Sequence, residues 1–134
     1  LLTQQIAVQS MIPRRYGRIV NIASVAGLKG SRPEYLRAIA YHTSKGGLVN
    51  FTRALAGEWG QHSITVNAIS PGYIPSKMTE GLLEKITPRV IAATPLHQIG
   101  EPRDLEGLVV LFASAAARHI TGQVIAVDGG ASVV

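Results

Sequence analysis

The sequence predicts an α/β fold in which helices cover both faces of a parallel β-sheet. Three short apolar stretches, at 18–24, 63–70 and 122–128, are rich in β-branched residues and read as buried strands. Segments with helical apolar spacing separate them. Strands that alternate with helices pair in parallel, because each connection crosses a face of the sheet. A length of 134 residues is that of one domain.

The first half is expected to hold two helices around the first strand. Apolar residues at helical spacing over 1–12 predict a helix that has no N-cap before it and ends at "PRRYG". Residues 25–39 contain two glycines and a proline and predict a long loop with at most one helical turn. The clearest helix is expected at 40–60. Its apolar stripe, which fits a core or a subunit interface equally well, is Leu48, Phe51, Leu55 and Trp59.

The second half is expected to complete the sheet. Pro71 and Gly72 end the strand at 63–70, and residues 73–100, with three prolines, predict two short helices joined by turns. Pro102 introduces another amphipathic helix, and a glycine turn closes the last strand. The first strand would keep one exposed edge, so three strands are not expected to be the whole fold.

Composition argues against several classes of protein. The chain has no cysteine for disulfides or thiolate metal sites, and its four histidines lack metal-ligand spacing. The lack of cysteine also favours a reducing compartment, so a cytoplasmic location is expected. No apolar run approaches the roughly 20 residues of a membrane span, and the N-terminus has no signal-peptide pattern. The net charge of +5 is spread along the chain without interleaved aromatics, which does not favour nucleic-acid binding.

A tyrosine and a lysine stand four residues apart near the start of the helix at 40–60. Tyr41 and Lys45 therefore project from one face, about one turn apart. An ammonium beside a phenol stabilises the phenolate, and such a phenol exchanges a proton with an alcohol or carbonyl oxygen. The same pair also occurs on ordinary helix surfaces, so the spacing alone leaves both interpretations open.

Two strand ends support the catalytic interpretation. Ser24 and the Pro71–Gly72 pair lie where strands of a parallel sheet are predicted to end, which is the edge where such sheets bind ligands. A serine hydroxyl there can donate to a substrate oxygen, although a turn or cap is its commoner role. Glycine at such a place allows close approach of a flat ligand, or simply makes a turn. The three features together predict an active site at this edge.

Four segments taken together resemble the short-chain dehydrogenase/reductase family: "GRIVNIAS" (17–24), "AYHTSKGGLVNFTRALAGEW" (40–59), "ITVNAISPGYIPSKM" (64–78) and "ITGQVIAVDGG" (120–130). The resemblance runs in order along the whole chain. It implies a Rossmann-like, doubly wound parallel sheet and an enzyme that uses NAD or NADP to interconvert an alcohol and a carbonyl by hydride transfer.

The resemblance also implies roles for single residues. Ser24 would orient the substrate oxygen, Tyr41 would act as general acid and base, and Lys45 would bind the nicotinamide ribose. The expected cofactor-binding residues are Tyr41, Lys45, Pro71, Gly72, Ile74 and Ser76, the last standing where the family has a threonine that contacts the pyrophosphate. The expected substrate-binding residues are Ser24, Ala26, Tyr73 and Met78.

Other family features do not occur in this sequence. The glycine-rich TGxxxGxG turn, the NAG strand end and the proton-relaying asparagine are absent. Residues 1–134 are therefore expected to form the C-terminal half of a single Rossmann-like NAD(P)-binding catalytic domain, with about three strands, and to be inactive alone. The residues that would choose between NAD and NADP are not among them.

The substrate and the assembly are also suggested by resemblance. The 17 positions from Ser24 to Tyr41 and the segment "PGYIPSKMT" are similar to the gluconate 5-dehydrogenase-like subgroup, which implies a secondary alcohol or ketone of a polyol or sugar acid. Alternatives are reduction of 3-oxoacyl thioesters or cyclic ketones, or an inactive half-fold that serves as a scaffold. Family members are commonly tetramers, so a homo-oligomer, tetramer or dimer, is expected. Loop cations that would attract a carboxylate, or would simply be solvated, are Lys29, Arg32, Arg37 and Lys77.

Overall fold

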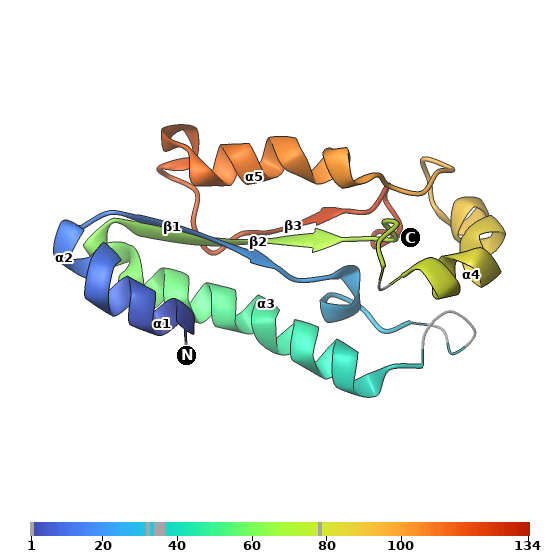
Figure 1. Ribbon diagram of the computed structural model, residues 1–134, viewed down its shortest axis with the longest axis horizontal. Coiled ribbons are helices and arrows are strands. Elements are labelled where there is room, and N and C mark those ends of the chain that lie inside the picture. The colour runs from blue at the N-terminus through green and yellow to red at the C-terminus, as the bar shows by residue number, and fades with distance from the viewer. Residues whose placement is uncertain (1, 32, 34–36, 78) are drawn as a thin grey trace.

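A computed structural model describes residues 2–31, 33, 37–77 and 79–134, and it confirms the parallel α/β sheet. The strands are β1 (Gly17–Ile22), β2 (Ile64–Pro71) and β3 (Val124–Val127), in the order β1-β2-β3 (Figure 1). Both pairings are parallel, with Gly17 opposite Ile64 and Ala68 opposite Val124. All carboxyl ends therefore meet at one edge of the sheet.

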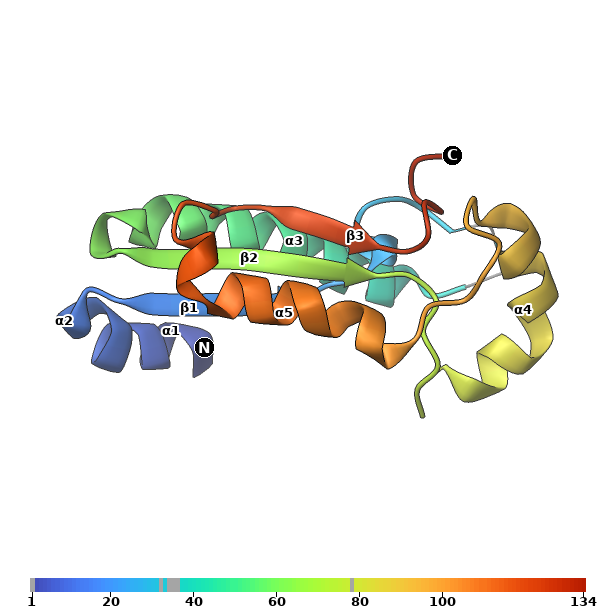
Figure 2. The same ribbon diagram turned by 90° about the horizontal axis from the view of Figure 1, so that it is seen from above.

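Helices cover both faces of the sheet, as predicted. A continuous N-terminal helix, made of α1 (Leu2–Ile6), the π-helical η1 (Ala7–Met11) and α2 (Ile12–Arg14), lies beside α3 (Ile39–Trp59) on one face (Figure 1). Helix α5 (Glu106–Ala113) covers the other face, and α4 (Glu80–Ala93) lies beyond the carboxyl ends of the strands (Figure 2). Short 3₁₀ turns link these elements: η2 (Val25–Gly27), η3 (Gly60–His62), η4 (Pro102–Leu105) and η5 (Ala115–Ala117).

The core forms around β2, whose residues 64–70 are all buried because both neighbours pair with it and both faces are covered. On the α3 face, Leu55 and Trp59 are 3% and 4% exposed and pack against Ile19 and Val66. Two residues of the apolar stripe of α3 thus lie in the core, and the other two, Leu48 and Phe51, are partly buried against it. On the opposite face, Phe112 of α5 packs against β2.

The prediction of two short helices within 73–100 was wrong, because α4 is one helix of 14 residues with Pro88 inside it. Proline removes an intrahelical hydrogen bond and costs about 3 kcal/mol. Pro88 and Glu84, whose carbonyl loses its partner, are both exposed, so that carbonyl faces solvent. The opposite side of α4 buries three apolar side chains, each worth roughly 1.5–3 kcal/mol, which outweighs the proline: Leu83, Ile86 and Val90.

The sequence predicts that the first strand keeps one exposed edge, and β1 has such an edge in the described structure. Within the part of the chain that the structure describes, no strand pairs with it, and Ile22 at its end is 46% exposed. The described helices include none with the length and apolar content needed to cross a bilayer.

Candidate functional site

Ser24 lies just beyond the carboxyl end of β1. Its side chain is buried, and its Oγ accepts a hydrogen bond from the Ala26 amide at 3.2 Å, which caps the turn η2. The cap role and the predicted substrate role are compatible, because a hydroxyl that accepts one bond still has a proton to donate. Ala26, predicted to bind substrate, is buried in the same turn.

Lys45 links the first turns of α3 to the end of β1. Its Nζ donates to the carbonyl oxygen of Ile22 at 2.8 Å, two residues before Ser24. The same ammonium lies 5.7 Å from the centroid of the Tyr41 ring, so the predicted pair does share one helix face. Because an ammonium has three N–H donors, two of those on Lys45 stay available beyond the bond to Ile22.

Gly27 brings η2 against α3 at the same place. A Cβ on this residue would lie 2.6 Å from both the carbonyl carbon and the oxygen of Lys45, so only glycine fits. Gly27 stands in no motif that marks it as part of a site. The short "VAG" after a strand end was the available signal, but it is also common in ordinary turns.

The chain after β2 runs close to the end of β3. The Gly72 amide donates to the Val127 carbonyl at 2.9 Å, and a Cβ on Gly72 would lie 2.8 Å from the Asp128 Cα. Pro71 is the last residue of β2 and is half-buried. The Pro71–Gly72 turn thus presents backbone, without a large side chain, at the strand edge.

Ile74 and Ser76, which are also predicted to bind the cofactor, lie in the segment that leads from β2 into α4. Thr79 organises it: its Oγ1 donates to the Ile74 carbonyl at 2.8 Å, accepts from the Ser76 amide at 2.9 Å and lies 3.0 Å from the Ser76 hydroxyl. Thr79 was missed because a threonine before a helix is an unremarkable feature in sequence. Met78, predicted to bind substrate, lies outside the described residues.

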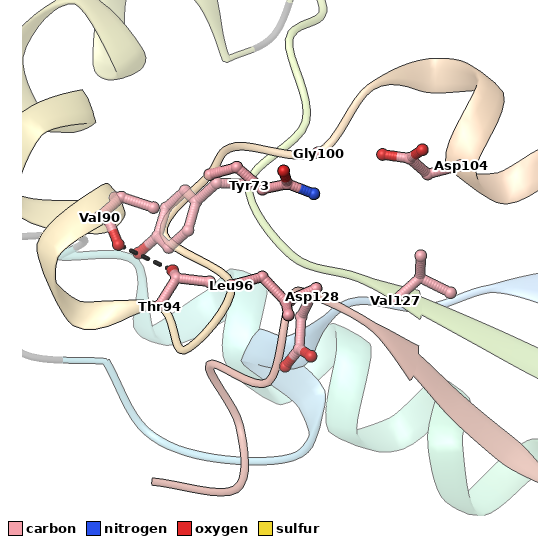
Figure 3. A pocket seen from close by; sticks show the side chains of 10 residues that line it. Tyr73, Val90, Thr94, Leu96, Gly100, Asp104, Val127 and Asp128 are labelled. Atoms are coloured by element: carbon pink, nitrogen blue, oxygen red, sulfur yellow. Dashed lines mark hydrogen bonds between the residues drawn. The ribbon is translucent and has the colours of Figure 1, made fainter.

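Tyr73 lies between two cavities beside this edge. One, of about 210 Å³, is bounded by the loop after β2, by α4 and by the end of β3, and Figure 3 shows the Tyr73 ring near Val90 and Thr94. The Tyr73 carbonyl accepts a hydrogen bond from the Gly100 amide at 3.1 Å, which fixes the loop after β2. A second cavity, of about 300 Å³, shares Tyr73, Val90 and Thr94 but extends to Val25, the neighbour of Ser24.

The edge thus combines hydroxyl and ammonium donors with adjoining space for a small ligand. Ser24 follows the end of β1, Lys45 bonds the Ile22 carbonyl at that end, and the Lys45 ammonium lies 5.7 Å from the centroid of the Tyr41 ring. Among the residues whose positions are described, no group of three or more histidine or acidic side chains is arranged to hold a metal ion. This arrangement suits proton transfer and hydrogen bonding to an oxygen.

Fold and sequence place the chain in a known class. The family model described as enoyl-(acyl carrier protein) reductase matches residues 1–132, and the chain belongs to the short-chain dehydrogenase/reductase family. A short-chain type dehydrogenase/reductase from Mycobacterium marinum superposes with a TM-score of 0.89 at 37% identity, over 97% of this chain and 50% of that one.

Individual relatives have different names. The 3-oxoacyl-(acyl-carrier-protein) reductase FabG of Aquifex aeolicus is 40% identical over 96% of this chain and 50% of its own. A gluconate 5-dehydrogenase from Burkholderia cenocepacia J2315, solved with NADP and tartrate, superposes with a TM-score of 0.90 at 27% identity, over 97% of this chain and 50% of that one. The chain thus spans about half the length of the relatives it matches.

Proposed function

We propose that this chain is the catalytic, nicotinamide-binding half of an NAD(P)-dependent oxidoreductase that interconverts a secondary alcohol and a ketone by hydride transfer. The observation that carries the proposal is the contact between Lys45 and the Ile22 carbonyl, which brings the Tyr41–Lys45 face of α3 to the strand end that presents Ser24. Family membership supports the same activity. Residues 1–134 then form the C-terminal half of one Rossmann-like domain.

Each side chain has a specific task in this proposal. The Tyr41 hydroxyl exchanges a proton with the substrate oxygen, and the Ser24 hydroxyl donates a hydrogen bond to that oxygen. The Lys45 ammonium, 5.7 Å from the Tyr41 ring centroid, is close enough for its charge to act on the phenol. Proton transfer from a positioned side chain contributes typically about 10²–10⁴-fold to a rate.

The residues at this edge fit the nicotinamide end of the cofactor. Lys45 has two N–H donors beyond its bond to Ile22, which suits ribose hydroxyls, and Pro71–Gly72 offers a backbone surface for a flat ring. When bound, the nicotinamide donates or accepts the hydride. The relative from Burkholderia cenocepacia was solved with NADP. The assignments of Ile74 and Ser76 to the cofactor remain predictions.

A polyol or a sugar acid such as gluconate is the substrate we favour. The name of the gluconate 5-dehydrogenase relative and the cavities beside Tyr73 support this class. The reductase of Aquifex aeolicus, at 40% identity, supports reduction of a 3-oxoacyl thioester as the second candidate. Parallel assays of gluconate oxidation and 3-oxoacyl thioester reduction separate the two. Assembly as a dimer or tetramer stays a prediction.

Tyr41→Phe tests the proposal, because it removes the hydroxyl and keeps the ring. In the full-length enzyme we expect kcat to fall at least about 100-fold. The dissociation constant for NADP, measured by fluorescence titration, should change far less than kcat, because Lys45 and the Pro71–Gly72 backbone are kept. Tyr16→Phe is the matched control, because Tyr16 is 52% exposed and precedes the amino end of β1, away from the carboxyl ends of the strands. A Tyr41→Phe enzyme as active as the Tyr16→Phe enzyme would show that the phenol carries no proton.

A further inference from the structure

The first turn of α3, which carries Tyr41, has few hydrogen bonds of its own. Tyr41 is the third residue of this helix, and the first amides of a helix have no partner within it. Ala38, which precedes the helix, makes no side-chain cap bond. Lys45 bonds the end of β1, but one turn further along. The turn that holds the proposed proton donor therefore depends on other contacts to keep it from fraying.

His42, the residue after Tyr41, closes this turn with its ring. The ring Nδ1 lies 2.9 Å from the Ala38 carbonyl oxygen, which also accepts a bond from the His42 amide at 3.1 Å. A carbonyl oxygen only accepts, so Nδ1 carries the proton in this bond. The ring thus adds a second hydrogen bond to the backbone bond at the start of the helix.

The other ring nitrogen of His42 reaches the loop that follows Ser24. Its Nε2 lies 2.9 Å from the Ser31 Oγ, and both side chains are half-buried. With the proton on Nδ1, the Nε2 of a neutral imidazole accepts, so the Ser31 hydroxyl is the donor. In the described part of the chain, His42 is the one side chain of α3 that forms a hydrogen bond with loop 28–37. This bond therefore joins the loop to the first turn of α3.

The Ser31 end of this link is connected to the edge where the strands end. Ser24 caps the turn η2, and the Lys29 amide, just after η2, donates to the Val25 carbonyl at 3.1 Å. Hydrogen bonds thus continue from Ser24 to within two residues of Ser31. Through His42 they reach the residue next to the proposed proton donor. The link therefore acts on the separation of the two hydroxyls that are proposed to meet the substrate oxygen.

The loop cations predicted to attract a carboxylate do not make a second link of this kind. Arg37 is exposed, and Lys77 is exposed on the segment before α4. Lys29 donates to the Ala131 oxygen rather than to α3. Arg32 lies outside the described residues. Within the described residues, the histidine thus supplies the side-chain bond between the loop and this turn.

We propose that His42, through its bond to Ser31, is a positioning residue that keeps Tyr41 in reach of the substrate oxygen. This inference rests on the proposed function and names a residue on which the proton transfer depends, although its ring does not touch the substrate. Without the link, the first turn of α3 loosens while Lys45 keeps its bond to Ile22. The reacting geometry is then lost more often than the cofactor contacts, so proton transfer slows.

His42→Phe tests the inference, because phenylalanine keeps a planar ring and removes both ring nitrogens. In the full-length enzyme we expect kcat to fall roughly tenfold, less than the on the order of 100-fold that a misplacement of about 1 Å costs. KM for the alcohol and the dissociation constant for NADP should change far less than kcat, because Ser24 and Lys45 are kept. His42→Gln, whose amide can bond the Ser31 hydroxyl, should recover most of the loss. His119→Phe, at an exposed position between η5 and β3, is the matched control with unchanged kcat.

A double-mutant cycle isolates the bond itself. Ser31→Ala removes the other partner with little change in volume and should also lower kcat. Residues that share one bond have non-additive effects, so the enzyme with both changes should be no slower than His42→Phe alone. Hydrogen–deuterium exchange of the amides in 40–45 should be faster in His42→Phe, with the urea midpoint close to wild type, because the opening is local.

The outcomes separate this inference from the proposed function. A His42→Phe enzyme with wild-type kcat, where Tyr41→Phe abolishes activity, overturns the role of His42 and leaves the proposed function intact. Fully additive effects of the two partners overturn it as well, because they show that the bond carries nothing. A fall in kcat accompanied by an equal loss of substrate and cofactor binding also overturns it, since that is a general structural effect. If Tyr41→Phe keeps full activity, the proposed function and the inference fail together.

Discussion

Gly27→Ala probes the joint between the turn η2 and helix α3. The added Cβ would lie 2.6 Å from the carbonyl carbon and oxygen of Lys45, whereas ordinary contacts begin near 3.4 Å. The two backbones would therefore have to separate by about 0.8 Å. Backbone atoms cannot rotate out of the way as a side-chain end does. Overpacking of this kind costs typically about 1–3 kcal/mol in the free energy of unfolding.

The same separation displaces the residues proposed to be catalytic. Ser24 caps η2, and the added Cβ would clash with the backbone of Lys45. The distance between Ser24 and Lys45 would therefore change. Misplacement by about 1 Å costs on the order of 100-fold in rate. We expect the Gly27→Ala enzyme to lose about 2 kcal/mol of stability, a shift of about 1 M in the urea midpoint at an m-value near 2 kcal/mol/M. We expect kcat to fall by 10-fold or more.

Gly47→Ala on the same helix is the control. Apart from the adjoining residues and the backbone of α3 itself, no described atom lies within 4 Å of the Cβ that this change adds. Alanine inside a helix is favoured over glycine by about 0.5–1 kcal/mol, so this enzyme should be more stable than wild type and equally active. Urea unfolding followed by tryptophan fluorescence measures the stability of both variants, and their kcat values measure the activity. A Gly27→Ala enzyme with the wild-type midpoint and rate would refute the argument from the close contact.

Two further predictions concern the core. Trp59→Ala should lower the free energy of unfolding by about 3–5 kcal/mol, because the indole is 4% exposed in the cluster under β1 and β2; thermal unfolding measures it. Asn67→Leu should cost roughly 2–6 kcal/mol, because the Asn67 amide bonds the Ile120 carbonyl at 2.8 Å and the Gln123 amide at 3.1 Å, and both would be left unpaired. An Asn67→Leu midpoint equal to wild type would show that these bonds do not hold β3 in place.

Much of the fold was predictable because burial leaves a direct trace in sequence. β2 is covered on both faces, and its segment is rich in apolar and β-branched residues although Thr65, Asn67 and Ser70 are polar. Helix α3 shows its core side as a stripe at helical spacing. The prediction for α4 was wrong because the rule that Pro88 breaks a helix considers only the neighbouring sequence. The three side chains that α4 buries are a tertiary effect, invisible to local spacing.

The site was predictable only in part, for a similar reason. Ser24, Tyr41 and Lys45 stand in short motifs, so sequence alone named them. The bond between His42 and Ser31 joins residues 11 positions apart across a loop, and no spacing rule connects a loop serine to a helix histidine. Gly27 was missed because the atoms it must avoid belong to a helix that begins 12 residues later.

Two side-chain links between α3 and β1 help to position Tyr41. Lys45 bonds the Ile22 carbonyl, and two turns further along Thr52 accepts a bond from the Asn21 side chain at 2.9 Å while donating to the Leu48 carbonyl at 2.8 Å. Two links separated along the axis fix both the distance and the direction of a rigid helix. The first turn of α3 then projects past the end of the strand at a defined angle, which holds Tyr41 beside Lys45.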